Sequence, residues 1–149
     1  MKRLKRILCT FVAMLTVSLA ANAGDNYAHD ASALPVAAKT TLQKNFKSKV
    51  SLVKVDKDFG RISEYEVIMT DGSEITFDKD GNWKEVEVNI SKSVPTGFIP
   101  TGVSNYVKAN QKGKKVVGIE KKKDGYEVEL NNGVEMRFDK QGNFIRYEK

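Results

Sequence analysis

An internal repeat constrains the fold of this chain more than any other feature. Residues 65–67 and 126–128 both have the sequence Tyr-Glu-Val, and residues 77–79 and 138–140 both have the sequence Phe-Asp-Lys. Each matched pair is separated by the same 61 positions, and the glycines and aromatic residues that follow recur in the same order. A repeat of this length indicates two copies of one supersecondary unit.

Each copy begins with the pattern of an amphipathic helix. In the first copy Leu34, Ala38, Leu42 and Phe46 recur every four residues next to Pro35, and the second copy has Ile99, Val103, Tyr106 and Val107 next to Pro100. Gly102 weakens the second helix pattern. Four alternating, strand-like stretches follow each helix, and they cover residues 50–56, 62–69, 73–78 and 83–90, then 115–121, 125–130, 134–139 and 144–148. The predicted fold class is α+β, with two tandem units of one helix and a four-stranded antiparallel meander.

The N-terminus has the pattern of a secretory signal peptide. Lys2, Arg3, Lys5 and Arg6 precede an apolar run at 7–20, and Ala-Asn-Ala at 21–23 is a cleavage motif. The run is short for a membrane span of ~20 residues, which disfavours a retained anchor. We therefore expect a signal peptide at 1–23, a disordered tail at 24–33, repeats at 34–91 and 92–149, and a periplasmic protein.

Removal of the signal peptide changes the charge argument. The full chain has a net charge of +6, and without those four basic residues the mature chain has +2. This charge gives no reason to expect a nucleic-acid partner. The only cysteine, Cys9, lies in the signal peptide, so the mature chain cannot form a disulfide.

The expected hairpin registers decide which side chains share a face. A three-residue loop at 70–72 places Val67 opposite Ile75 and Tyr65 opposite Phe77, and the second copy repeats this arrangement. A two-residue loop at 80–81 places Ile75 opposite Val86, and the equivalent loop at 141–142 pairs Phe138 with Ile145. In this register Trp83 and Phe144 lie on the face away from the core.

The face away from the core is expected to be acidic. It carries nine acidic and two basic side chains: Glu66, Glu74, Asp78, Glu85, Glu87, Glu127, Glu129, Glu135 and Asp139, with Arg137 and Arg146. An exposed sheet face is commonly charged simply because it is solvated. The alternative is a docking surface, for which the candidate contact residues are Trp83, Phe144, Glu66, Glu74, Asp78, Glu127, Glu129 and Arg137.

The sequence contains no recognisable catalytic or metal-binding pattern. The only histidine, His29, lies in the expected tail, so neither a Ser-His-Asp triad nor a histidine-based zinc site can form. Residues 78–82 resemble the start of a calcium loop, but its sixth position is Trp83 and its twelfth is Asn89. We expect no cofactor, no metal and no enzymatic activity.

The repeat motifs resemble those of a known family of bacterial periplasmic proteins. Leu34-Pro35, Tyr65–Val67, Phe77-Asp78 and the run from Asp80 to Trp83, with their second copies, are similar to the PepSY-like, β-lactamase-inhibitor-like family. The resemblance implies a tandem repeat whose sheets align into one concave surface. Inhibition of a β-lactamase is implied only as an analogy of fold, since no inhibitory residue can be matched.

Two functions therefore stay open. One is a protein-binding or inhibitor-like module that acts through the sheet face on an envelope protein, for which an enzyme is one candidate. The alternative is a sensor of a small ligand or cation. In both cases we expect a monomer without a membrane span after signal cleavage.

Overall fold

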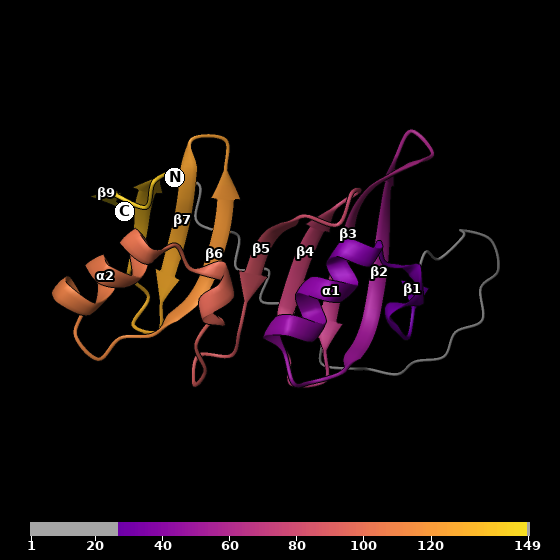
Figure 1. Ribbon diagram of the computed structural model, residues 1–149, viewed down its shortest axis with the longest axis horizontal. Coiled ribbons are helices and arrows are strands. Elements are labelled where there is room, and N and C mark those ends of the chain that lie inside the picture. Colours follow the sequence, from indigo (N-terminus) through magenta and orange to yellow (C-terminus); the bar gives the residue numbers. More distant parts are fainter. Residues whose placement is uncertain (1–26, 149) are drawn as a thin grey trace.

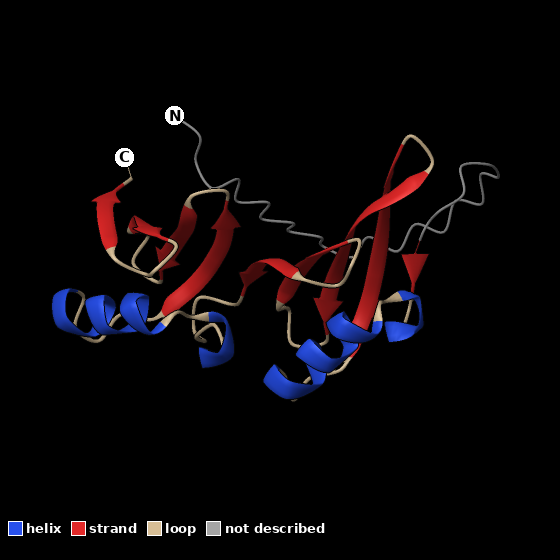
Figure 2. Ribbon diagram, turned by 45° about the horizontal axis from the view of Figure 1, so that its top comes forward, coloured by secondary structure: helices blue, strands red, loops and turns tan. Residues whose placement is uncertain are grey.

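The computed structural model describes residues 27–148 and contains one continuous antiparallel sheet. Its nine strands are arranged in the order of the chain, each hydrogen-bonded to the next (Figure 1). The helices lie along one face of this sheet, as Figure 2 shows, and no helix or strand among residues 27–148 covers the opposite face. The expected signal peptide at 1–23 lies outside the described residues.

The strands and helices follow the expected order closely. The first half of the sheet contains α1 (Val36–Asn45), β2 (Val50–Asp58), β3 (Arg61–Met69), β4 (Glu74–Asp78) and β5 (Trp83–Glu87). The second half contains α2 (Thr101–Asn110), β6 (Val116–Lys122), β7 (Gly125–Leu130), β8 (Glu135–Asp139) and β9 (Phe144–Tyr147). Three short elements complete the fold: β1 (Tyr27–Ala28), η1 (Ala31–Ala33) and η2 (Thr96–Phe98). The antiparallel α+β class is confirmed, whereas the division into two units stays a prediction.

Both helices begin directly after a proline and bury a narrow apolar stripe. Ala38 and Leu42 of α1 are buried, as are Val103 and Val107 of α2. Gly102 lies within α2 and does not interrupt this helix. Glycine is needed at position 102 because the turn at Gly142 packs closely against the helix there. A Cβ at position 102 would lie 2.5 Å from the carbonyl oxygen of Gly142, so only glycine permits this close approach.

Alternate residues of the strands form the core beneath the helices. Val53, Phe77, Val86, Ile119 and Phe138 have no exposed surface, and they belong to one cluster that extends through both halves. This cluster is continuous because β5 pairs directly with β6, where Val86 lies opposite Ile119. The core therefore crosses the boundary between the two sequence repeats.

The expected disordered tail is wrong for its second part. Tyr27 lies opposite Lys54 at the edge of β2, so β1 extends the sheet by one short strand. Asp30 then caps η1, because its carboxylate accepts a hydrogen bond from the backbone N–H of Ser32 at 2.7 Å. Residues 24–26 of the expected tail lie outside the described residues.

The first hairpin register in each half is confirmed. Val67 lies opposite Ile75 and Tyr65 opposite Phe77, and Met69 donates its N–H to Ser73 across a three-residue loop. In the second half Val128 lies opposite Met136, as expected.

The second hairpin register is wrong next to the turn. The N–H of Asp78 bonds to the carbonyl of Asn82, so the loop contains three residues rather than two. A β-bulge then restores the expected pairing of Ile75 with Val86. Between the turn and the bulge, Phe77 faces Trp83, and the equivalent bulge places Phe138 opposite Phe144 instead of Ile145. One extra residue reverses the face of a side chain, so Trp83 and Phe144 lie on the core side.

Candidate functional site

The open face, defined here as the sheet face opposite the helices, carries a row of polar side chains that crosses eight strands. Directly opposed residues from β2 to β9 form this row, because each register aligns one of them with the next. The row contains Lys54, Glu66, Thr76, Glu85, Glu120, Glu127, Arg137 and Arg146. It has basic side chains at both ends and carboxylates in its middle.

Basic side chains in the first half neutralise the acids near them. Lys54 lies 3.0 Å from a carboxylate oxygen of Asp56 and 3.2 Å from one of Glu66. Lys84, the extra residue of the bulge, pairs with Glu64. Lys54 and Lys84 therefore add positive charge to this face and compensate the acids next to them.

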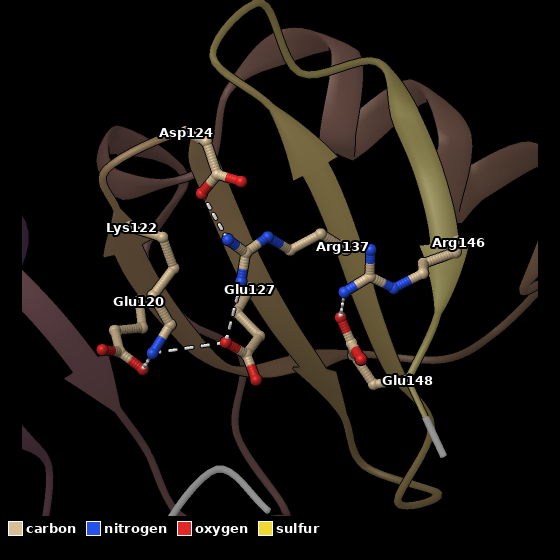
Figure 3. A network of polar contacts seen from close by, with 7 residues as sticks. All are labelled: Glu120, Lys122, Asp124, Glu127, Arg137, Arg146 and Glu148. Carbon is tan, nitrogen blue, oxygen red and sulfur yellow. Dashed lines mark hydrogen bonds and ion pairs between the residues drawn. The ribbon is translucent and has the colours of Figure 1, made fainter. Parts of the chain in front are cut away.

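A larger ion-pair network covers the second half (Figure 3). Glu127 is only 7% exposed, and one of its oxygens lies 3.3 Å from both Lys122 and Arg137. Lys122 also pairs with Glu120, and Arg137 pairs with Asp124 at the β6–β7 turn. A buried carboxylate needs such partners, so the ion pairs of Glu127 and Arg137 serve the fold itself and do not require a bound partner.

The centre of the open face lacks such compensation. Glu74 and Glu87 are directly opposed across β4 and β5, and Glu85 is opposed to Glu120 across β5 and β6. Like charges in opposed positions repel each other. Glu74, Glu85 and Glu87 are half-buried and form no ion pair with any residue in 27–148. We call these three residues the central carboxylates.

The surroundings of the central carboxylates favour their protonated forms. Burial, followed by repulsion from Glu120, raises the pKa of Glu85 to about 7. Burial and repulsion from Glu85 and other acids likewise raise the pKa of Glu87 to about 7. The pKa of Glu74 is also raised, first by burial and then by Glu66. A positive group placed here would relieve both the desolvation and the mutual repulsion.

Two aspartates of the open face stabilise turns instead. Asp78 accepts hydrogen bonds from the backbone N–H groups of Asp80 and Asn82, each at 2.9 Å. Partial burial acts to raise the pKa of Asp78, but the hydrogen bonds of Asn82 and Asp80 hold it below its ordinary value. Asp139 has equivalent bonds with Gln141 and Asn143. The calcium-like run at 78–82 is therefore a hairpin turn with a carboxylate occupied by its own backbone.

Trp83 and Phe144 lie beneath the helices, on the face opposite the candidate site. The ring of Trp83 meets Phe98 edge-on with a centroid distance of 5.4 Å, and the Nζ of Lys121 lies 3.9 Å from the Trp83 ring centroid. Phe144 stacks on Tyr106 of α2 at 4.2 Å. The two aromatic rings thus attach the last hairpin of each half to the helix layer, and they are not contacts of the open face.

The remaining expected site residues do lie on the open face. Glu66, Glu74, Glu127, Glu129 and Arg137 occupy opposed positions in its rows. The sequence did not indicate that Glu120 and Lys122 belong to this surface, because no turn or repeat motif predicts that β5 pairs with β6. The only available signal was the position of Glu120 directly after the apolar Ile119, which places the two side chains on opposite faces of a strand.

One open cavity of about 510 Å³ lies on the helix side, between α1 and the first residues of β2. Its wall includes the apolar residues Leu42, Phe46 and Met69 together with Asp30 and Lys39. The Ser48 hydroxyl at this cavity has no hydrogen-bond partner. The cavity is separate from the open face.

Residues 27–148 contain neither a metal-binding cluster nor a membrane-spanning helix. No group of three or more histidine, cysteine, aspartate or glutamate side chains in this range could hold a metal ion. The helices of the same range are also too short or too polar for any of them to cross a membrane.

The fold and the polar open face define the class of protein as an open antiparallel sheet with helices packed on one face. The chain belongs to the family described as "Putative beta-lactamase-inhibitor-like, PepSY-like", whose model matches residues 63–146. This match confirms the resemblance inferred from the repeat motifs. No curated protein matches the chain.

Three solved structures are similar over nearly the whole described chain. A proposed periplasmic protein of unknown function from Bacteroides vulgatus ATCC 8482 is 41% identical with a TM-score of 0.78, and the match covers 85% of this chain and 100% of that one. A proposed calcium-regulated periplasmic protein from Bacteroides thetaiotaomicron is 38% identical with a TM-score of 0.76, covering 84% and 97%. A second periplasmic protein from Bacteroides vulgatus ATCC 8482 is 34% identical with a TM-score of 0.73, covering 85% and 100%.

Proposed function

We propose that this protein is a non-catalytic module of the periplasm that binds a basic partner protein on the open face of its sheet. The central carboxylates are the observation that carries the proposal. Glu74, Glu85 and Glu87 are opposed to like charges and form no ion pair within residues 27–148, although the surrounding acids do. A lysine or arginine of a partner would supply the missing positive charge.

The shape and location of the surface support a protein partner. The open face crosses eight paired strands, and no helix or strand of the described range 27–148 covers it, which leaves a large area for a single small molecule. The similar solved structures are described as periplasmic, which agrees with the secretory pattern at 1–23. The partner is thus an envelope protein, and an enzyme is one candidate.

A paired set of variants tests this function. Glu85→Gln with Glu87→Gln removes charge from the centre, whereas Asp80→Asn, the turn variant, removes charge from an exposed turn elsewhere. Wild-type protein and the turn variant should capture the same basic protein from an envelope extract, and the central variant should not. With the captured protein purified, its association rate should fall as salt rises from about 50 to about 500 mM, because screening weakens long-range attraction.

Two results would contradict the proposal. One is a partner whose capture is unaffected by the central variant. The other is an association rate that stays flat across the salt series, since binding would then not use the charge of this face.

A cation sensor is the second candidate, and one observation favours it. The similar protein from Bacteroides thetaiotaomicron is described as calcium-regulated. If calcium binds the folded protein, the melting temperature should rise with calcium concentration, and a central variant that keeps this rise would place the bound ion away from the central carboxylates. Magnesium at equal ionic strength is the control for screening.

A further inference from the structure

The β2–β3 hairpin carries an aromatic side chain that lies outside the core of the fold. Phe59 lies at its tip, and its side chain is exposed over its whole surface (106%). The hairpin stands clear of the other strands at the upper right of Figure 1, and Figure 2 shows the same projection. No ring contact links Phe59 to another aromatic residue of the described chain.

The backbone at this tip is unfavourable for a phenylalanine. Asp58 lies opposite Arg61, so Phe59 and Gly60 form a two-residue loop. Their φ angles of 49° and 78° correspond to a turn in which asparagine and glycine are preferred. Phe59 is the only residue other than glycine with a positive φ in the described chain. A bulky residue in this region costs free energy, which an asparagine would largely avoid.

The equivalent hairpin in the second half lacks these features. Four residues separate Lys121 from Tyr126 there, whereas nine separate Val55 from Tyr65 in the first half. The tip of the short hairpin consists of Lys123 and Asp124, and Asp124 pairs with Arg137. The long hairpin is therefore not required by the fold that the two halves share.

We propose that Phe59 is the anchor of a second binding element, which inserts into an apolar pocket of a partner protein. A single ring on a projecting two-residue turn fits a concave pocket, because a flat surface would leave most of the ring exposed. Strained residues that persist without a packing role are characteristic of functional sites. This inference goes beyond the proposed function and does not depend on the open face.

The charges beside Phe59 indicate the rim of that pocket. Lys57, Asp58 and Arg61 are exposed, and none of them forms an ion pair with a residue in 27–148. Their net charge is positive, so an acidic rim is complementary. The same charges disfavour insertion into a lipid bilayer, because Asp58 would be desolvated for the burial of only one ring.

A first measurement separates a binding role from a structural one. Phe59→Asn should unfold at an equal or higher urea concentration than the wild type, because asparagine is preferred at this turn position. A lower midpoint would mean that Phe59 stabilises the fold, and it would overturn the proposal.

A second measurement identifies what the ring contacts. The photo-crosslinking residue p-benzoylphenylalanine is placed at position 59 of the full chain in the bacterium that encodes it, and at the exposed Val36 as a control. We expect position 59 to crosslink to one protein that position 36 does not capture. Crosslinks only to lipid, only to a second copy of this chain, or to nothing would each overturn the proposal.

The third measurement is the affinity of Phe59 variants for the partner that the crosslink identifies, purified without the crosslink. Phe59→Asn should weaken its affinity at least about tenfold, whereas Phe59→Tyr, which keeps the ring, should bind within about threefold of the wild type. Equal binding by Phe59→Asn would overturn the anchor. The Glu85→Gln, Glu87→Gln variant tests the open face separately, so failure of one proposal is distinguishable from failure of the other.

Discussion

The hairpins β2–β3 and β6–β7 occupy corresponding places in the two halves of the sheet, yet they end in opposite ways. The long hairpin exposes Phe59 at a strained turn, while the short hairpin is held by ion pairs of Lys122 and Arg137. Thr76 occupies the place in the first half that Arg137 has in the second. The open face therefore has a strong network on one side and a projecting, unattached hairpin on the other.

This difference shows where the two copies are constrained. The last hairpin of each half packs on the helix layer through an aromatic ring, because Trp83 meets Phe98 of η2 and Phe144 stacks on Tyr106 of α2. Packing therefore keeps the helix side similar, whereas the hairpin tips and the open face have diverged. Divergence away from the core is expected where binding, rather than folding, determines the residue.

The largest expected loss of stability comes from removing an aromatic ring that packs the last hairpin on the helix layer. Phe144→Ala should lower the free energy of unfolding by about 3 kcal/mol, because the stacked ring on Tyr106 is lost and a cavity remains. Urea unfolding measures this change. Ile145→Ala at the neighbouring half-exposed bulge is the control and should cost less than about 1 kcal/mol. Equal losses would mean that Phe144 is not an attachment point of the helix layer.

The hairpin pattern alone could not predict on which face of the sheet the side chains of Trp83 and Phe144 lie. A two-residue loop and a three-residue loop followed by a bulge give the same pairing beyond the bulge, so the expected pair of Ile75 with Val86 is correct. Only the residue between the turn and the bulge changes face. The hydrophobic pattern therefore fixes the far end of such a hairpin and leaves its turn end undetermined.

The fold was more predictable than the candidate site. Helix periodicity, turn residues and the repeat predicted nearly every strand, because these signals are local. The opposition of Glu85 to Glu120 depends on the pairing of β5 with β6, which joins segments that no tight turn connects. Glu85 was expected on the acidic face, but its opposition to Glu120 could not be derived from either repeat alone. The exposure of Phe59 could not be predicted from the sequence either. Residues 57–60 indicate a turn, but they do not indicate how far the hairpin extends from the sheet.

Removal of Arg137 tests the network of the second half. Arg137→Gln should lower the free energy of unfolding by about 2 kcal/mol, because Glu127 is buried and loses one of its two basic partners. Arg146→Ala removes the exposed pair with Glu148 and should cost less than about 0.5 kcal/mol. Thermal or urea unfolding of both variants provides the comparison. If they unfold alike, the network does not distinguish the second half from the first.

The pH dependence of stability tests the centre, where the two halves meet. The folded-state pKa values of Glu85 and Glu87 are raised to about 7, so the native state binds protons that the unfolded state has released. Their stabilising contribution is complete below the ordinary pKa and is lost as pH rises through about 7. Glu85→Gln with Glu87→Gln should therefore exceed the wild type in stability by about 1 to 2 kcal/mol at about pH 8, after allowance for solvent screening of half-buried groups.

The same comparison at lower pH tests whether ionisation of Glu85 and Glu87 causes the difference in stability. At about pH 4 the carboxyl groups are protonated in both states, and the advantage of the glutamine variant should disappear. Asp80→Asn on an exposed turn is the matched control and should show no comparable gain at high pH. A glutamine variant that is less stable than the wild type at about pH 8 would contradict the arrangement of unpaired acids.

The smallest expected effect comes from converting the long hairpin into the short one. Replacing Lys57–Glu64 by the sequence Lys-Asp-Gly of residues 123–125 removes the five extra residues and keeps a glycine where the backbone of Gly125 requires one, with φ 153°. The free energy of unfolding should change by less than about 1 kcal/mol, because shortening a loop has a small entropic effect and the excised side chains are largely exposed. Urea unfolding gives this value, and hydrogen exchange should show unchanged protection at Val53 and Val67. A large loss of stability would mean that the extension supports the first half of the sheet, and the long hairpin would then be part of the fold and not an addition to it.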